Sequence, residues 1–361
     1  MAALLTGLMV IPSFQQAIAQ LVSAENTAAD GLSRNATELN VSIAVFDPGI
    51  PADASTHRRL QVFPRIRKIE ALYLPFVLHE VLVDSSQWGA VRVVPAADIA
   101  AELLVSGTII KSNGEILELQ IRAADASGRE WFTRNYTGAT TVIAAQGEAE
   151  PAAIGYQEIY AEIGADLEAA RALLDEQALA EIVDVSFLRY AIQLVPTAFD
   201  EYLSANPDGT FTIDRLPAQN DPMLERLGRI RGVEYLITDA VDTKFQELHA
   251  EIASIYELWR SYRRKFTQYQ LDETRRLENV KTDAPKGSFE AIRSAYDNYK
   301  WSRIAEQEQE SWADGFNNEV GPTIEKMEIR VAELEGWVDQ QYAEWSALLA
   351  ELFALETGRT E

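Results

Sequence analysis

The most regular hydrophobic pattern of the chain lies in its C-terminal half. Apolar and aromatic residues follow one another there at alternating spacings of four and three, which keeps them on one side of an α-helix. A helix with such a seam must cover it, because exposed apolar surface is unfavourable in water. The seam consists of Val241, Phe245, Leu248, Ile252, Ile255, Trp259, Tyr262, Phe266 and Tyr269.

A second seam of the same kind follows near the C-terminus, interrupted only by Gln341. Breaks between the seams predict three long helices at 222–281, 288–318 and 322–356, and the first would span ~80–90 Å at about 1.5 Å per residue. We expect the seams to pair with each other, with another subunit, or with the preceding domain, and the large rings of the first seam favour a third layer. The second seam consists of Ile324, Met327, Val331, Leu334, Val338, Gln341, Trp345, Leu348, Leu352 and Leu355.

The N-terminal half shows short β-branched runs around one helical segment. "VSIAVFD" (41–47) and "GAVRVVP" (89–95) predict strands, and residues 65–85 carry apolar side chains at helical spacing. Within 96–138 we expect first a short helix and then strands separated by two hairpin turns. Together these elements predict a mixed sheet with helices packed on it. The expected turns are at Ser112-Asn113-Gly114 and Ser127-Gly128.

These patterns divide the chain into three structural parts. An α/β domain spans 40–147, an acidic connector of helices and a loop spans 148–220, and a long helical hairpin or bundle spans 221–361. Asp221 and Pro222 are typical of a helix start. The predicted fold class is therefore α+β, an N-terminal mixed-sheet α/β domain followed by a coiled-coil-like hairpin or bundle of long helices.

One stretch resembles a domain of known proteins. Residues 101–131, "AELLVSGTIIKSNGEILELQIRAADASGREW", look like the strand, glycine, hairpin and strand segment of a small periplasmic α/β domain. The curli-secretion channel lipoprotein, the N-terminal domain of the Tol-Pal propeller protein and outer-membrane activators of peptidoglycan synthases contain similar domains. The resemblance covers about residues 41–145, and it implies a fold used for protein contacts that supplies no catalytic residue. The chain lacks the lipid-bearing cysteine of the lipoprotein members.

The N-terminus has the pattern of a secretory signal peptide. An apolar stretch precedes the small-x-small site Ala17-Ile18-Ala19, which predicts a signal peptide at residues 1–19, and the polar residues 20–39 predict a flexible leader. An apolar helix or membrane anchor is the alternative, but Pro12 interrupts the stretch, which falls short of the ~20 apolar residues of a spanning helix. We therefore expect a periplasmic protein of a Gram-negative bacterium, with no integral membrane span in the mature chain.

Composition excludes several classes of function. The chain has no cysteine, which excludes disulfides, thiolate metal sites and thiol catalysis. Its formal net charge of −24 repels phosphate backbones, so no nucleic-acid partner is expected. His57, His79 and His249 have no second histidine at metal-ligand spacing, and no phosphate-loop, dinucleotide or serine-nucleophile motif occurs. We expect no metal, no cofactor and no catalytic residue.

Two carboxylates, Asp47 and Asp53, flank the sequence "PGIPA" after the first predicted strand. Asp before Pro-Gly is common in turns, because its side chain accepts hydrogen bonds from backbone amides while Pro and Gly set the dihedral angles. A functional carboxylate at the strand end is the alternative. We favour the turn.

Two basic clusters, residues 57–68 and 260–276, stand out from the acidic background. In one interpretation their Arg side chains pair with Glu and Asp nearby on helix surfaces. In another they dock an acidic partner, including the acidic segment 148–184 of a second copy, because Arg and aromatic residues often concentrate binding energy at interfaces. The aromatic seam itself is expected to be core. The candidate interaction residues are Arg58, Arg59, Arg65, Arg67, Trp259, Arg260, Tyr262, Arg263, Arg264, Phe266 and Tyr269.

These observations favour a non-enzymatic interaction or scaffold protein of the bacterial cell envelope, which docks a protein partner or forms a homo-oligomer through its long helices. One alternative is a subunit of an outer-membrane secretion or assembly ring, which follows from the resemblance alone. The other is a cell-wall glycan enzyme with a carboxylate pair, for which Asp47, Asp53 and Glu80 are the candidates.

Overall fold

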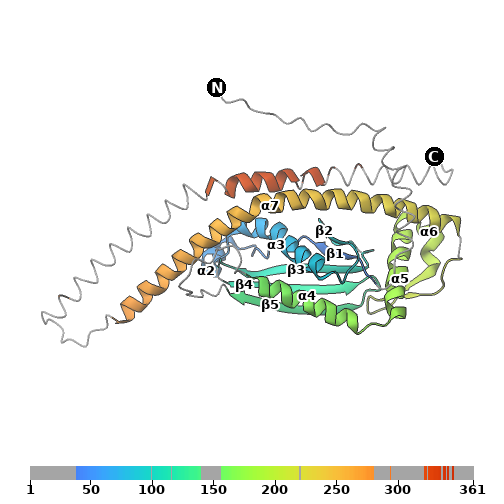
Figure 1. Cartoon of the computed structure of the whole chain (residues 1–361), viewed down its shortest axis with the longest axis horizontal. Helices are drawn as coiled ribbons and strands as arrows, with labels where there is room; N and C mark the ends of the chain where they lie inside the picture. The colour runs from blue at the N-terminus through green and yellow to red at the C-terminus, as the bar shows by residue number, and fades with distance from the viewer. Residues whose placement is uncertain are drawn as a thin grey trace, which may run out of the picture.

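The structure is a computed structural model of the chain (Figure 1). It describes residues 38–98, 100–114, 116–139, 156–218 and 221–279, followed by 293, 321–322, 324–334, 336–338, 340 and 344. The predicted signal peptide and residues 20–37 of the predicted leader lie outside these ranges. Among the described helices, none combines the length and the apolar character needed to cross a membrane.

A five-stranded sheet forms the centre of the N-terminal half. Its strand order is β2-β1-β3-β4-β5. Strand β1 pairs in parallel with β2 and β3, whereas the pairs β3–β4 and β4–β5 are antiparallel, so the sheet is mixed as predicted. The strands are β1 (Val41–Ala44), β2 (Val91–Val94), β3 (Leu103–Ser112), β4 (Ile116–Asp125) and β5 (Glu130–Ala139).

Helix α3 (Pro64–Ser85) connects β1 to β2 and confirms the predicted strand-helix-strand unit. Its first residue is Pro64, where a missing N–H removes no helical hydrogen bond. Pro75 lies inside the helix and leaves the carbonyl of Ala71 without its usual donor. The N–H of Phe46 donates to that carbonyl at 3.0 Å instead. The interior proline therefore ties α3 to the end of β1.

Both predicted hairpins are confirmed. Strands β3 and β4 are joined across Gly114, and β4 and β5 across Gly128. The φ angles of these glycines are +91° and +81°, in a region that only glycine adopts without steric cost. Turn chemistry, which is local, therefore determines where the three antiparallel strands begin and end.

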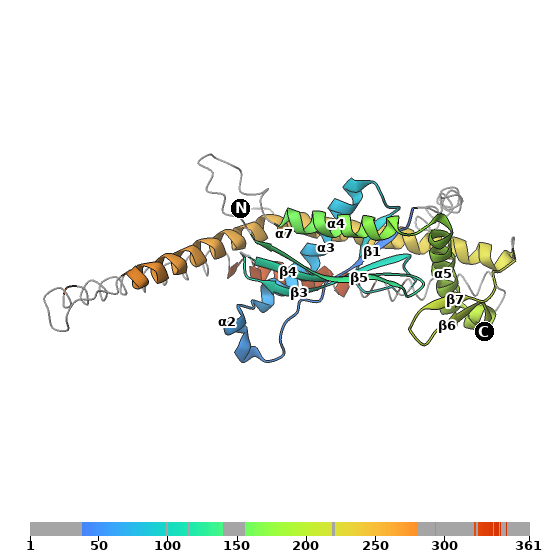
Figure 2. The ribbon, with the colours of Figure 1, turned by 90° about the horizontal axis from the view of Figure 1, so that it is seen from below.

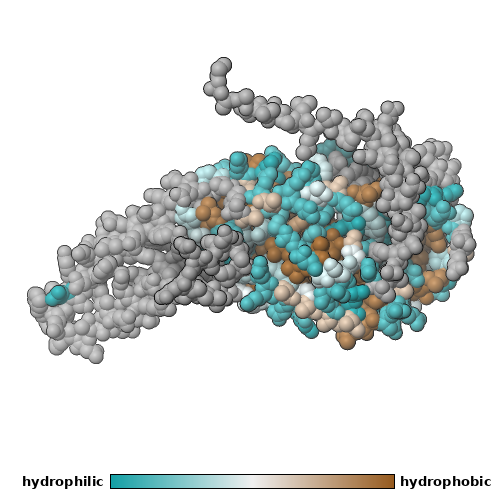
Figure 3. Space-filling view, in the orientation of Figure 1, coloured by the Kyte–Doolittle hydropathy of each residue, from teal (hydrophilic) through white to brown (hydrophobic). Residues whose placement is uncertain are grey.

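Side chains alternate between the two faces of the sheet. Val105, Leu119 and Ile121 are fully buried on one face, whereas Gln120 and Arg122 are exposed on the other. On the buried face, α3 contacts β1, β2 and β3, helix α4 (Gln157–Ala172) contacts β5, and helix α7 (Pro222–Asn279) contacts β2. On the part of the surface that Figure 3 colours, hydrophilic and apolar residues are interspersed.

The connector contains the predicted acidic helices. Helix α5 (Glu176–Leu194) follows α4, and Asp175 caps it by accepting a hydrogen bond from the Ala178 N–H at 2.8 Å. Arg189 of α5 donates to the carbonyl of Ala126 at 2.7 Å, which fastens the connector to the β4–β5 turn. The remaining short elements are η1 (Ala54–Thr56), α2 (His57–Leu60), α6 (Pro196–Phe199), η3 (Asp200–Tyr202), β6 (Leu203–Ala205) and β7 (Phe211–Ile213).

The prediction of a short helix after β2 is wrong. The described residues 95–98 and 100–102 contain bends and a turn but no helix. The carboxylate of Asp98 accepts a hydrogen bond from the Ala100 N–H at 2.8 Å, and that of Glu102 turns inward to accept one from the Asn40 N–H at 2.7 Å. These side-chain contacts with the backbone replace helical hydrogen bonds and bring the chain directly into β3.

Helix α7 begins at Pro222 and ends at Asn279, close to the predicted bounds of 222–281. Its 58 residues correspond to roughly 85 Å of helix. The first seam faces inward, and its partly buried Tyr262 packs at the rim of the core. The structure does not describe the side chains of Ile255, Phe266 and Tyr269. The buried seam residues are Val241, Phe245, Leu248, Ile252 and Trp259.

Part of the second seam joins the same core. Ile324, Met327, Val331 and Val338 are helical and buried there. Seam positions from Gln341 onwards, and the predicted helix 288–318 apart from residue 293, lie outside the described ranges. In its coarse form the predicted fold is confirmed, since a mixed α/β arrangement with a five-stranded mixed sheet is joined to several helices, one of them long.

Candidate functional site

The two basic clusters meet at a buried glutamate that the sequence analysis did not single out. Arg67 comes from α3, Arg260 comes from α7, and Glu70 lies between them, one turn along α3 from Arg67. All three residues are almost completely buried, and Glu70 has no exposed surface. Buried charges are rare in proteins unless they are paired, so this cluster is the most unusual chemical feature of the described chain. We call it the Glu70 junction.

The carboxylate of Glu70 joins three elements. Its Oε1 accepts hydrogen bonds from the Tyr256 hydroxyl of α7, at 2.7 Å, and from the Ser112 hydroxyl of β3. Its Oε2 lies 4.0 Å from Nε of Arg67 and has no hydrogen-bond partner among the described residues. Burial raises the pKa of Glu70, and the hydrogen bonds from Ser112 and Tyr256 oppose that rise.

Arg67 ties α3 to the end of β3. Its guanidinium donates to the carbonyls of Ile109 at 2.6 Å and Ile110 at 3.2 Å, next to a register shift in β3. Burial lowers the pKa of Arg67, and the charge of Glu70 opposes this change. A side chain with five donors suits such a bulge, where strand carbonyls lose their ladder partners.

On the α7 side, Arg260 lies next to Tyr156, and Arg263 holds the β3–β4 hairpin. Arg260 donates to Glu257 at 2.6 Å and lies over the ring of Tyr156, 4.3 Å from its centroid. Arg263 donates to the Asn113 carbonyl at 3.2 Å, and at Gly114 a Cβ atom would lie 2.5 Å from the Cβ of Arg263. The turn glycine thus permits both the backbone conformation and the close approach of α7.

The structure brings several predicted interaction residues together, but inside the protein. Arg67, Trp259 and Arg260 are at most 3% exposed, and Tyr262 and Arg263 are partly buried. These five residues lie between α7 and the α/β domain, so they offer little surface to a partner. Arg59 and Arg65 are exposed, and Arg65 pairs with Glu328 at 3.3 Å. The side chains of Arg58, Arg264, Phe266 and Tyr269 lie outside the description.

One local signal for Glu70 was present in the sequence. Arg67 and Glu70 are spaced i, i+3 on the apolar face of α3, so an opposite-charge pair points into the core. That spacing also occurs often on exposed helix faces, which is why it did not stand out.

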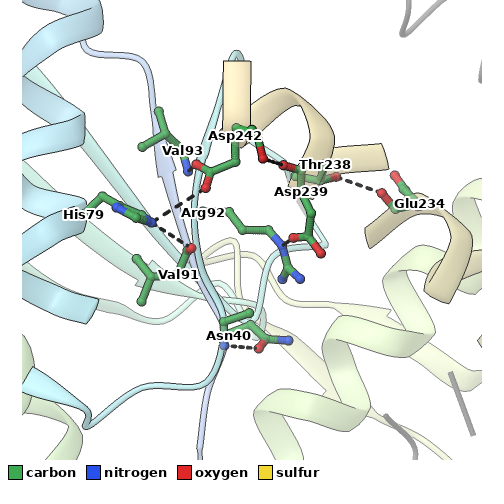
Figure 4. Close-up of polar contacts among 11 residues, drawn as sticks. Asn40, His79, Val91, Arg92, Val93, Glu234, Thr238, Asp239 and Asp242 are labelled. Atoms are coloured by element: carbon green, nitrogen blue, oxygen red, sulfur yellow. Dashed lines mark hydrogen bonds and ion pairs between the residues drawn. The ribbon is translucent and has the colours of Figure 1, made fainter. Parts of the chain in front are cut away.

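A second polar cluster covers the edge of β2 (Figure 4). The carboxylate of Asp242 on α7 accepts a hydrogen bond from the Val93 N–H at 2.9 Å, and His79 of α3 contacts the Val91 carbonyl through Nε2 at 3.2 Å. Asp239 of α7 pairs with Arg92 at 2.5 Å. Helices α7 and α3 therefore occupy outer backbone groups of this edge strand, which otherwise could pair with another chain.

The three histidines have packing or backbone partners. Nε2 of His57 lies 2.8 Å from the Pro51 carbonyl, and the His79 contact to Val91 is given above. His249 stacks on Tyr73 with a centroid distance of 4.5 Å. Within the described ranges, no group of three or more His, Asp or Glu residues is arranged to hold a metal ion.

His249 should make stability depend on pH. Its pKa is lowered to about 4 from 6.5, first because burial disfavours the charged ring and then because of His79. Folding therefore favours the neutral ring, and the resulting stability is present above pH 6.5 and lost as the pH falls towards 4. The full pKa difference would lower the free energy of unfolding by about 3 kcal/mol at low pH. Because His249 is partly exposed, we expect a loss of about 1–2 kcal/mol. Urea unfolding of wild type and His249→Gln at pH 7.5 and 4 should show this extra loss in the wild type, and equal losses in both proteins would contradict it.

Asp47 and Asp53 have the local roles expected of turn residues. Asp47 Oδ1 accepts a hydrogen bond from the Gly49 N–H at 2.8 Å, and Asp53 Oδ1 accepts from the Ser55 N–H at 2.9 Å. Gly49 has a φ of +58°, and a Cβ there would lie 2.1 Å from the Ile109 oxygen. The "PGIPA" turn therefore packs tightly against β3.

The Glu70 junction can hold helices and strands together, because its charged groups face one another and the backbone.

Comparisons of the chain with protein-family models, with curated proteins and with solved structures find no match.

Proposed function

We propose that the chain is a non-enzymatic interaction or scaffold protein of the bacterial cell envelope, exported to the periplasm, whose α/β domain holds a long helix in a fixed direction. The observation that carries this proposal is the attachment of α7. Hydrogen bonds from Tyr256 to Glu70, from Val93 to Asp242 and from Arg263 to Asn113 fasten one long helix to α3, β2 and the β3–β4 turn.

The part of α7 beyond these contacts supports the role of a projecting rod. Arg263 is at the β3–β4 turn, and the helix continues to Asn279. Residues 264–279 add about 24 Å of helix at about 1.5 Å per residue. In two perpendicular views this end of α7 runs past the sheet and away from it (Figures 1 and 2). A helix fixed at its base and extended at its tip suits the presentation of a binding surface at a distance.

We also propose that the C-terminal residues return along α7 as the second arm of a helical hairpin. Arg330 lies 3.5 Å from Glu251 of α7, and Glu328 lies 3.3 Å from Arg65 of α3. The buried second-seam residues, from Ile324 to Val338, supply the apolar contact that such an arm requires.

The export part of the proposal depends on the sequence pattern of residues 1–19. Release by osmotic shock, followed by N-terminal sequencing, should give a mature chain beginning near Gln20. Retention of the full-length chain in the cytoplasmic fraction would contradict export.

Site-specific photocrosslinking in intact cells tests the scaffold role. A benzophenone side chain at Leu258 or Leu236, which are exposed on α7, should give discrete high-mass adducts. The matched control is Leu173, which is 86% exposed between α4 and α5 and should give none. Absence of adducts from both α7 positions would overturn the proposal.

A further inference from the structure

The two edges of the five-stranded sheet are treated differently. Strand β2 has four residues, and Asp242 and His79 bind its outer backbone groups. Strand β5, the other edge, has ten residues. In the described part of the chain its backbone hydrogen-bonds only to β4. A strand of that length without partners at its edge is suited to pair with another extended chain.

Strand β5 is both accessible and rigid. Thr133, Asn135 and Thr137 are exposed along it, and none of them is charged. Tyr136 is buried towards α4, where its hydroxyl donates to Asp166 at 2.6 Å. Gly138 lies against Ile159 of α4, where a Cβ would be 2.6 Å away. A strand held in place in this way needs little ordering before it binds.

Acidic side chains of α4 line this edge. Asp166 pairs with Arg134 of β5 at 2.7 Å. The hydrogen bond and the charge of Asp166 raise the pKa of Arg134, and the nearby charge of Glu162 adds to this rise. Glu158 and Glu162 are exposed on the same helix. The surface beside the open edge therefore favours a positively charged ligand.

We propose that the outer edge of β5 is a docking site for an extended, basic segment of a partner protein, which adds to the sheet as a sixth strand. Main-chain hydrogen bonds to β5 supply the pairing, and alternate Lys or Arg side chains lie towards Glu162 and Glu158 on α4. This inference depends on the proposed interaction function and names the chemistry of one partner.

A second copy of the chain fits this edge less well. Pairing of β5 with β5 about a two-fold axis would bring two α4 helices, each with exposed Glu158 and Glu162, next to each other. Repulsion between like charges opposes that arrangement, and the net charge of −24 adds to it.

The test uses a labelled synthetic decapeptide of alternating lysine and valine, added to the full chain and followed by fluorescence anisotropy at physiological salt. In a second peptide the backbone nitrogens of all lysines are N-methylated, and in a third those of all valines. Both keep the charge of the parent peptide. Because only one edge of an added strand faces β5, one methylated peptide should bind at least about tenfold more weakly and the other should bind nearly as well as the parent. Equal binding of all three peptides, or no binding of the parent, would overturn the proposal.

Two variants locate the binding site on the protein. Glu162→Gln should weaken binding of the parent peptide by about three- to tenfold, whereas Glu176→Gln, an exposed residue at the start of α5, should leave it unchanged. Equal affinities for both variants would overturn the site.

A separate variant tests whether a second copy occupies the edge. Asn135→Cys should stay monomeric under oxidation, and an efficient disulfide-linked dimer would identify a second copy as the occupant instead. If the peptide fails while Leu258 still gives adducts, the docking site is wrong and the scaffold role stands.

Discussion

Replacing Trp259 with aspartate is expected to lower the free energy of unfolding by more than about 5 kcal/mol. Removing a buried Trp alone costs about 3–5 kcal/mol, and a buried carboxylate without a partner adds several more. Trp259 has no exposed surface and packs edge-on against Phe63 of the loop before α3, with ring centroids 6.0 Å apart. The substitution should therefore separate α7 from the α/β domain as well as destabilise it.

Thermal melts followed by circular dichroism measure this effect, and the neighbouring residue gives a matched control. Leu258 is 39% exposed on the same turn of α7, so Leu258→Asp should change stability by no more than about 1 kcal/mol. If Trp259→Asp does not fold, Trp259→Phe should still fold with a loss of about 1–3 kcal/mol. An unchanged melt for Trp259→Asp would show that the seam does not pack as described.

The second large effect is expected at Arg67. Arg67→Met keeps much of the side-chain volume but removes the donors to the carbonyls of Ile109 and Ile110 and leaves Glu70 with less compensating charge. Breaking a buried pair by removing one partner costs about 3–5 kcal/mol. We expect a loss of that size in the free energy of unfolding, measured by urea titration at pH 7.

Two further variants separate this effect from a general effect of lost charge. Arg59→Met removes a nearby but exposed guanidinium and should change stability by less than about 0.5 kcal/mol. Adding Glu70→Gln to Arg67→Met should recover part of the loss, because the uncompensated carboxylate is then removed. Additive losses for the two substitutions would argue against an interaction between Arg67 and Glu70.

Local patterns were enough to predict much of the fold. The four-three spacing from Val241 to Trp259 predicted one side of α7, and the seam residues in this stretch whose side chains are described are buried. The glycines of the two hairpins and the strand-helix-strand pattern of 41–95 gave the strands and α3 correctly. These predictions succeed because helix period, strand period and turn dihedrals depend on neighbours within a few residues.

Residues whose role depends on distant partners were not predicted. The helix expected after β2 did not form because Glu102 binds the backbone of Asn40, 62 positions earlier in the chain. Glu70 went unnoticed because its partner Tyr256 is 186 positions away. The same holds for Arg67 and Arg260, which looked like surface arginines and are buried.

The sequence by itself determined strands β1 to β5, helix α3 and the apolar side of α7, since these follow from local spacing and backbone chemistry. Only the tertiary structure decided where that apolar side goes, because several partners could have covered it and the choice depends on shape and buried charge. Packing on α3 and β2 placed Glu70 beside Tyr256 and Asp242 beside Val93, and left the outer edge of β5 without a backbone partner among the described residues.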